Sequence, residues 1–300
     1  MRDPTVNDAP RARRSCHAVP ASSEKFLAKA PELGADMYFL DLEDAVALDA
    51  KVQARDLAAT AIAEAAWGDA VVCVRVNAWA TDLTDADLTA IVAARTARLD
   101  EVMLPKVESV DDIVDLDLRL SELEIKAGLE AGHIGIAALI ETARGVMNVE
   151  AIAGASPRLS SLVLGPLDLA ASLQMPPAAS GDPADHFDYV FMRLLVAARS
   201  FGLSVIDGPF PAVKDLDRLA TAAQRTRALG FDGKMTLHPG QIEVVNRIFS
   251  PSDAEIDRAR GIVAALEVDN ADGALFHDGE MIDEASAKAA RAILARADRA

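Results

Sequence analysis

Two acidic residues of this 300-residue chain follow directly on apolar, strand-like runs. Glu141 ends the run GIAALIE, and Asp168 ends SLVLGPLD, whose strand pattern breaks at Gly165-Pro166. If the two runs are neighbouring parallel strands, both carboxylates lie at the same edge of the sheet. Mg²⁺ takes one or two carboxylates and leaves its other positions to water or substrate. We therefore predict a site for Mg²⁺, with Mn²⁺ as a substitute, at Glu141 and Asp168. The alternative is two solvated acids, one of them capping the turn.

Other catalytic motifs are missing from the sequence. The chain has no H-E-x-x-H motif and no Cys/His cluster, which argues against zinc. No nucleophilic serine elbow, P-loop or G-x-G-x-x-G motif follows an apolar run. Acyl-enzyme, nucleotide-hydrolysing and dinucleotide-binding functions therefore lose their usual support.

A third group of acids lies in the segment LDLEDAV, where Asp41, Glu43 and Asp44 follow another apolar run. Three carboxylates packed together need a cation to offset their repulsion. We predict that they accept hydrogen bonds from metal-bound water. The alternative is ordinary capping of the helix that follows.

Three nitrogen-bearing side chains also stand late in apolar runs. Arg75 in VRVN needs a partner, because an unpaired buried guanidinium is costly; that partner is either a nearby acid or a substrate carboxylate. Lys106 in LPKVE is a Schiff-base candidate in principle, but an ion pair with the neighbouring acids is favoured. His238 in LHPGQ is expected to cap a helix or to lie in the core.

These side chains are positioned by a regular alternation of strand and helix patterns. Eight apolar runs are separated by helical, Ala-rich stretches, and they cover residues 14–20, 37–45, 70–78, 101–108, 135–142, 161–168, 203–210 and 233–239. Near-continuous apolar strands alternating with helices are typical of a parallel sheet covered on its faces. Eight such units predict a closed (β/α)8 TIM barrel, and a doubly wound open sheet is the competitor.

The barrel prediction explains where the polar residues lie along the runs. Ten of them come late in a run or just after it, namely Asp41, Glu43, Asp44, Arg75, Asn77, Lys106, Glu141, Asp168, Asp207 and His238. The carboxyl ends of the strands form the catalytic mouth of a TIM barrel. We therefore expect these groups to converge on one rim.

The pattern changes after residue 250. Residues 250–267 open with a capping box, Ser252 to Glu255, and continue as an amphipathic helix. Residues 268–283 are rich in turn formers, and 284–300 form a second helical pattern. We predict three parts: a flexible tail (1–10), a catalytic barrel (11–250) and a C-terminal helical extension (251–300).

Composition narrows the class of partner. The formal charge is −17, from 30 basic and 47 acidic residues, which argues against nucleic acid and anionic membrane surfaces. A small polyanion remains open, because residues 11–29 carry five basic residues and one acid, giving +4. The first ten residues lack an apolar signal region, and we expect a soluble cytoplasmic protein. Cys16 and Cys73, the only cysteines, are expected to be buried, reduced thiols.

Several motifs occur in an order that carries a family resemblance. They are FLDLEDAVALDAKVQAR, VRVN, MLPKVES, IETARG, GPLDLAAS, DGPF, GFDGKMTLHPGQIEVVN with FSPS, and GEMID. Over residues 14 to about 295 the chain resembles the CoA-ester lyases of the HpcH/HpaI aldolase and citrate-lyase-β superfamily, with malyl-CoA lyases as the most similar members. The resemblance implies a TIM barrel that binds Mg²⁺ at Glu141 and Asp168 and a 2-oxo acid at Arg75.

The resemblance also implies the remaining parts of the site. The phosphates of a coenzyme A thioester substrate are expected near Arg14 and Lys29. The acid/base residue is expected at Asp283, donated by a neighbouring subunit of a homotrimer or a dimer of trimers. From the sequence alone, Asp283 directly precedes a helix and is a good N-cap, which is the alternative role.

The implied reaction is reversible Claisen cleavage of a 3-hydroxyacyl-CoA. Malyl-CoA would give glyoxylate and acetyl-CoA, and β-methylmalyl-CoA would give glyoxylate and propionyl-CoA. The alternatives are a citrate lyase β subunit acting on a carrier-bound citryl thioester, a malate-synthase-like enzyme that hydrolyses the thioester, and a non-catalytic acyl-CoA-binding barrel.

Overall fold

The chain folds into two compact units, residues 1–246 and 247–300. The computed structural model describes residues 11–94, 98–176, 183–268 and 274–298. The division falls inside helix α9 (Pro239–Phe249), a few residues before the predicted boundary at 250. The predicted flexible tail, residues 1–10, lies outside the described residues.

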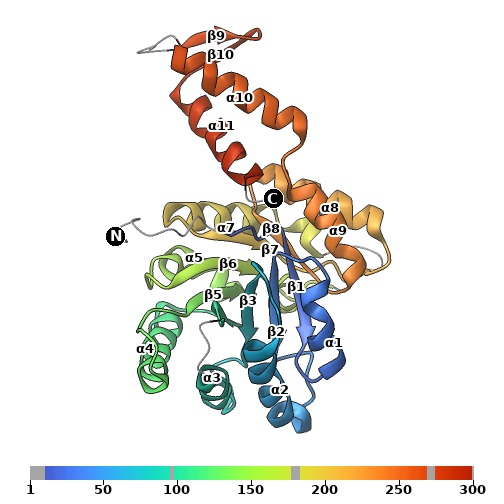
Figure 1. Cartoon of the computed structure of the whole chain (residues 1–300), viewed down its shortest axis with the longest axis vertical. Helices are drawn as coiled ribbons and strands as arrows, with labels where there is room; N and C mark the ends of the chain where they lie inside the picture. Colours follow the sequence, from blue (N-terminus) through green and yellow to red (C-terminus); the bar gives the residue numbers. More distant parts are fainter. Residues whose placement is uncertain (1–10, 95–97, 177–182, 269–273, 299–300) are drawn as a thin grey trace. The chain divides into compact units, whose positions relative to one another are not determined.

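The first unit is a closed barrel of eight parallel strands, which pair in chain order from β1 to β8 and back to β1 (Figure 1). The strands are β1 (Ser15–Pro20), β2 (Met37–Asp41), β3 (Val71–Arg75), β4 (Glu101–Leu104), β5 (Gly135–Ile140), β6 (Leu159–Leu164), β7 (Ser204–Asp207) and β8 (Gly233–Thr236). Each lies within one of the eight apolar runs, apart from the first two residues of β6. The predicted (β/α)8 barrel is confirmed, and the open doubly wound sheet is wrong.

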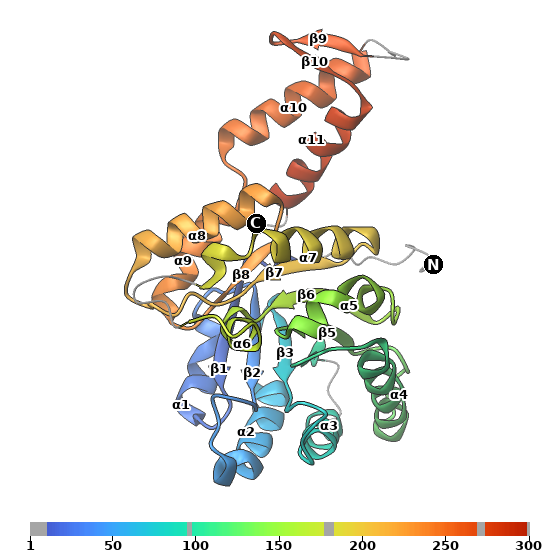
Figure 2. The ribbon, with the colours of Figure 1, turned by 180° about the vertical axis from the view of Figure 1, so that it is seen from behind.

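Helices follow the strands and cover the outside of the barrel, and Figure 2 shows the barrel from behind, where α6 is in view. They are α1 (Glu24–Lys29), α2 (Lys51–Glu64), α3 (Thr84–Ala93), α4 (Val110–Ala127), α5 (Ala143–Ala153), α6 (Pro166–Ser172), α7 (Asp188–Ser200), α8 (Leu216–Leu229) and α9, with short 3-10 turns η1 (Ala30–Glu32), η2 (Leu48–Ala50) and η3 (Pro183–His186). Local chemistry defines their ends: α4 starts at a capping box of Ser109 and Asp112 and stops at Gly128, whose φ is 79°.

Alternate residues of each strand fill the inside of the barrel. The inward set is Cys16, Met37, Phe39, Val71, Cys73, Met103, Ala137, Leu139, Val163, Ile206 and Met235. Both cysteines are buried free thiols, as predicted, and burial raises the pKa of each. Since side chains alternate along a strand, Asp41, Arg75 and Glu141 continue this inward series at its carboxyl end. The barrel interior is therefore filled with apolar side chains, and the layer at the carboxyl ends of the strands is charged.

The second unit is a pair of helices with a small hairpin between them. It contains α10 (Asp253–Val268), β9 (Leu275–His277), β10 (Glu280–Ile282) and α11 (Glu284–Ala297). The predicted capping box is confirmed: Ser252 N donates to Glu255 Oε2 at 2.8 Å, and Glu255 N donates to Ser252 Oγ at 3.3 Å. The hairpin was not predicted, although its turn residues Asp278 and Gly279 have φ of 50° and 83°, the conformation that Asp-Gly favours. Residues 269–273 of the predicted turn-rich segment lie outside the described residues.

No helix among the described residues combines the length and the apolar character needed to cross a membrane.

Candidate active site

Glu141 and the turn that carries Asp168 come together at the mouth of the barrel. Glu141 follows β5 and is only 1% exposed, and its Oε1 accepts a hydrogen bond from Lys106 N at 2.9 Å. The neighbouring strand β6 ends at Leu164, and a Cβ atom on the next residue, Gly165, would lie 2.4 Å from Glu141 Oε2. Glycine therefore allows the carboxylate to reach the β6–α6 turn, and Asp168 stands in the first turn of α6.

Electrostatics show that these acids share one environment. The pKa of Glu141 is raised to about 8, first by burial; Lys106 opposes the rise, while repulsion from Asp168 and Glu43 adds to it. A cation held between Glu141 and Asp168 would relieve that repulsion. The described part of the chain contains no group of three or more His, Cys, Asp and Glu that could hold a metal ion. The residues present fit Mg²⁺, which needs few carboxylates and keeps positions for water and substrate, better than zinc.

Arg75 has the ion-pair partner that the sequence left open. The last residues of β2 and β3, Asp41 and Arg75, are paired in register. Arg75 Nε and Nη2 donate to the two oxygens of Asp41 at 2.8 and 2.6 Å, and Nη1 lies 3.1 Å from Glu43 Oε2. Burial lowers the pKa of Arg75, but Asp41 and Glu43 outweigh it and the net shift is upward, so the guanidinium stays charged. A guanidinium has five N–H groups, so donors remain for a substrate.

Lys106 joins the acids of β2 to Glu141. Its Nζ lies 2.5 Å from Glu43 Oε1 and 3.9 Å from Glu141 Oε1, which confirms the predicted ion pair. The φ of Lys106 is 54°, which is uncommon for a residue other than glycine. In this conformation its main-chain N–H donates to Glu141 and its ammonium donates to Glu43. Glu43 Oε2 is buried and accepts no hydrogen bond from the residues that the structure describes, although Arg75 Nη1 is 3.1 Å away.

Asp41 also caps the turn after β2, but the alternative role of capping the helix that follows is wrong, because the N-cap of α2 is Ala50. Its oxygens accept hydrogen bonds from Glu43 N at 2.9 Å and Ala45 N at 3.2 Å. Asp44, by contrast, points outward, with a side chain that is 62% exposed. Hydrogen bonding of these acids to metal-bound water stays a prediction.

The sequence interpretation overlooked a buried polar cluster beneath this loop. Lys51 is 8% exposed, and its Nζ donates to the carbonyl oxygens of Leu42 and Glu43. Arg55 and Asp87 extend the cluster through a hydrogen bond of 2.5 Å. The helical periodicity of α2 could have predicted this cluster, because it places Lys51 and Arg55 on the same face as the apolar, buried Ala54, Ala58 and Ile62.

The three arginines of the basic cluster near the start of the chain pair with acids at the amino end of the barrel. Arg14 immediately precedes β1, so it lies at the amino end of the strands, opposite the mouth, and its Nε and Nη2 each donate to Asp36 at 2.8 Å. Arg11 and Arg13 pair with Asp100 and Glu101. Arg14 therefore lies at the opposite end of the barrel from the mouth, where the substrate's coenzyme A phosphates were expected, and its predicted contact with them is wrong. Lys29 ends α1 and is exposed; its predicted role is untested.

Two other rim candidates are structural. Asp207 follows the inward Ile206, so it faces the helices, where it accepts from Lys234 Nζ at 2.6 Å and Thr226 Oγ1 at 3.1 Å. The expectation that Asp207 reaches the mouth is wrong because of this alternation. His238 Nδ1 accepts from Gly240 N at 3.1 Å and so caps α9, as predicted.

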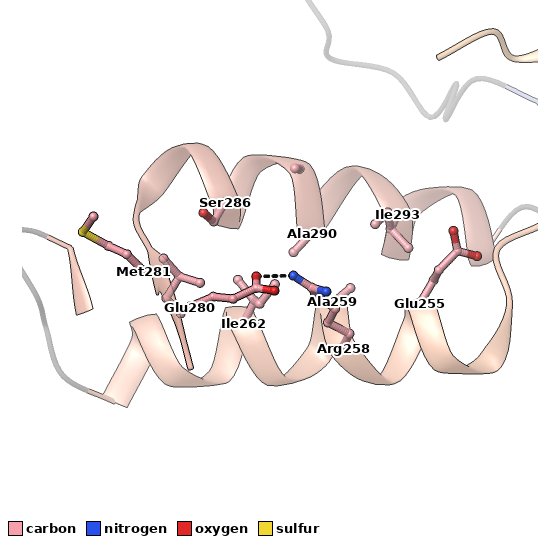
Figure 3. Close-up of a pocket in the computed structure, with 11 residues that line it drawn as sticks. Glu255, Arg258, Ala259, Ile262, Glu280, Met281, Ser286, Ala290 and Ile293 are labelled. Carbon is pink, nitrogen blue, oxygen red and sulfur yellow. Dashed lines mark hydrogen bonds and ion pairs between the residues drawn. The ribbon is translucent and has the colours of Figure 1, made fainter. Parts of the chain in front are cut away.

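Asp283 lies in the second unit and is the N-cap of α11. Its Oδ1 accepts from Ser286 N at 3.0 Å and Ser286 Oγ at 3.2 Å, and these bonds lower the pKa of the exposed carboxyl. The capping role is confirmed, and the catalytic role stays a prediction. Ser286 also lines a hollow of about 300 Å³ between α10 and α11, which Ile262, Ala290 and the ion pair of Arg258 with Glu280 line as well (Figure 3).

A closed barrel with carboxylates, an arginine and a lysine at the carboxyl ends of its strands is the architecture of a TIM-barrel enzyme. Residues 14–239 match the model of the HpcH/HpaI aldolase/citrate lyase family. The chain belongs to this family, and it is a lyase.

Individual relatives cover nearly the whole chain. An L-malyl-CoA/beta-methylmalyl-CoA lyase of Rhodobacter capsulatus is 33% identical over 99% of this chain and 98% of its own length. A (3S)-malyl-CoA thioesterase of Cereibacter sphaeroides is 37% identical over 95% of this chain and 94% of its own. The structure of CitE from Mycobacterium tuberculosis in complex with magnesium, acetoacetate and coenzyme A is similar, with a TM-score of 0.77, 30% identity, and coverage of 97% of this chain and 99% of that one.

Proposed function

We propose that this enzyme is a Mg²⁺-dependent CoA-ester lyase that cleaves and forms the carbon–carbon bond of a 3-hydroxyacyl-CoA. The substrates we propose are malyl-CoA and β-methylmalyl-CoA, which give glyoxylate with acetyl-CoA or propionyl-CoA. The observation that carries the proposal is the meeting of buried Glu141 with the turn of Asp168 beside two cations, Lys106 and Arg75. The named activities of the relatives support it.

Glu141 and Asp168 would hold the Mg²⁺, which when bound supplies a Lewis acid that polarises the carbonyl of the oxo acid. The chain's own groups keep this pair in place. The N–H of Lys106 orients Glu141 through Oε1, and the bare Cα of Gly165 leaves room for Oε2. The ammonium of Lys106, 3.9 Å from Glu141, offsets part of the negative charge.

Arg75 would bind the oxo acid. Its two bonds to Asp41 fix the plane of the guanidinium, so little freedom is lost when its other N–H groups donate to a substrate oxygen. Its positive charge then stabilises the negative charge that develops on that oxygen when the carbon–carbon bond forms.

Asp283 would move the proton. In condensation it takes the α-proton of the acyl-CoA, and in cleavage it returns that proton to the enolate. In water its carboxylate is a weak base, since its hydrogen bonds lower the pKa. We propose that it is inserted into the barrel mouth of a neighbouring subunit in a homotrimer or a dimer of trimers, where loss of water would raise the pKa.

The test is turnover of a panel of 3-hydroxyacyl-CoA thioesters with Mg²⁺, with Mn²⁺ and with chelator. Glyoxylate formation reports cleavage, and it should require the metal and disappear in Glu141→Ala. Metal-independent turnover, or no turnover of any thioester, contradicts the proposal.

Thioester hydrolysis is the second candidate, favoured by the 37% identity with a malyl-CoA thioesterase. The two reactions differ in their products. Cleavage of malyl-CoA releases glyoxylate and leaves the thioester intact as acetyl-CoA, whereas hydrolysis releases malate and the free thiol of coenzyme A. Parallel assays of glyoxylate and free thiol on the same sample therefore separate a lyase from a thioesterase.

A further inference from the structure

We propose that Lys51 is the positioning residue of the active site: it holds the main chain of the acidic loop after β2 so that Glu43 can join Arg75 to Lys106. The inference rests on the proposed function, because it assigns Lys51 to the mouth where the lyase reaction takes place. Lys51 stands at the start of α2 and contacts no group to which we assign substrate or metal.

The ammonium of Lys51 clamps the loop: it donates one hydrogen bond to each of three acceptors, two of which are carbonyl oxygens of the loop after β2. Its Nζ donates to Leu42 O at 2.6 Å, to Glu43 O at 2.6 Å and to Asn77 Oδ1 at 2.8 Å. An ammonium has three N–H donors, and three acceptors surround this one. Two of the acceptors are consecutive carbonyls of the loop, so Lys51 defines where the main chain of residues 42 and 43 lies.

The clamp is itself anchored to the neighbouring βα unit. Asn77 Nδ2 donates to Leu42 O at 3.1 Å and to Asp87 Oδ2 at 2.6 Å, and Arg55 Nε donates to Asp87 Oδ1 at 2.5 Å. All four side chains are buried. Buried polar groups whose bonds are all made hold one arrangement rigidly, because each lost bond leaves an unpaired group away from water.

Glu43 transmits this position to the mouth. Its carbonyl is held by Lys51, while its carboxylate lies 2.5 Å from Lys106 Nζ and 3.1 Å from Arg75 Nη1. Lys106 in turn holds Glu141 through its main-chain N–H. A shift of the main chain at Glu43 therefore displaces both cations, and a misplacement of about 1 Å is enough to slow an enzyme about 100-fold.

The test is Lys51→Met, which keeps an unbranched side chain that is one atom shorter and removes the three donors. We expect amide hydrogen exchange in residues 42–46 to rise at least about 10-fold. Mn²⁺ binding, followed by electron paramagnetic resonance, should weaken about 10-fold, and kcat should fall about 100-fold. The matched control is Arg158→Met, which removes an equally buried basic side chain at the amino end of β6, bonded to Glu124 and Asp117. It should destabilise the fold while leaving exchange in residues 42–46 and kcat within about threefold of wild type.

Lys51→Arg keeps the buried charge but replaces the compact ammonium by a planar fork that cannot fit the same three acceptors. It should fold and show the same three changes, and it decides the question if Lys51→Met does not fold. Wild-type exchange, metal affinity and kcat in a folded Lys51 variant would overturn the inference. Absence of metal binding and turnover in the wild-type enzyme would instead refute the proposed function, while the exchange rates would still report whether Lys51 holds the loop.

Discussion

Adding one methyl group at Gly165 should disable the metal site without unfolding the barrel. The φ of Gly165 is −105°, so this position does not need the left-handed conformation that favours glycine. The new Cβ would lie 2.4 Å from Glu141 Oε2 and 2.5 Å from Glu141 Cβ, whereas ordinary contact begins at 3.4 Å. Glu141 must therefore retreat by about 1.0 Å, the difference between 3.4 and 2.4 Å.

That retreat is large for a catalytic group. Sites of this kind work within about 0.5 Å of their productive geometry, and a misplacement of about 1 Å costs about 100-fold in rate. We expect Gly165→Ala to lower kcat about 100-fold and to raise the Mg²⁺ concentration for half-maximal activity, as measured by steady-state kinetics across a Mg²⁺ titration. Circular dichroism should show a folded barrel.

The matched control is Gly154→Ala at the far end of α5. Its Cβ would lie 2.7 Å from the ring of Phe201, but that ring is exposed and can turn into solvent. Gly154→Ala should therefore keep wild-type kinetics. If Gly165→Ala also stays within about threefold of wild type in kcat and Mg²⁺ dependence, Glu141 does not have to lie where the structure places it, and the reasoning fails.

Three further outcomes are expected. Arg75→Lys should raise KM for the oxo acid and lower kcat, because one ammonium cannot keep both bonds to Asp41 and still bind substrate; unchanged kinetics for both substrates would make Arg75 purely structural. Asp283→Asn keeps the cap, so stability should change by less than about 1 kcal/mol while kcat falls about 100-fold. Mixed in equal amounts with Glu141→Ala, it should recover about a quarter of wild-type activity if each site joins two subunits, and none if the tail serves its own barrel. Burial lowers the pKa of His17 to about 4, so below pH 6.5 the unfolded chain binds a proton that the folded one does not. Between pH 7 and pH 5 the free energy of unfolding should therefore fall by about 2 kcal/mol more in wild type than in His17→Asn. If urea unfolding at the two pH values gives the same fall in the free energy of unfolding for both proteins, the buried, neutral state of His17 is contradicted.

The strand ends could be predicted because their chemistry is local. A run of apolar residues that stops at an acid, as at Glu141, marks where a parallel strand leaves the core, and Gly165-Pro166 marks the same point on the next strand. The cap at Asp283 was readable for the same reason, since an N-cap depends on the next three residues alone. The end of β1 at which Arg14 lies was also readable, because Arg14 precedes the strand, and the family resemblance overrode that simple rule.

What the sequence determined by itself is thus the order of the barrel's strands and helices, the closed barrel, and the place of Glu141 and Arg75 at its mouth. Only the tertiary structure decided which partner each charge takes. Arg75 binds Asp41 because β2 and β3 pair in that register, and Asp207 turns away because Ile206 already faces the core. The helix pattern places Lys51 on the buried face of α2, but only the fold shows that its acceptors are the carbonyls of Leu42 and Glu43. The physical reason is range: helix caps, turns and apolar periodicity act over a few neighbouring residues, whereas the position of a buried charge depends on acceptors that folding brings from distant parts of the chain.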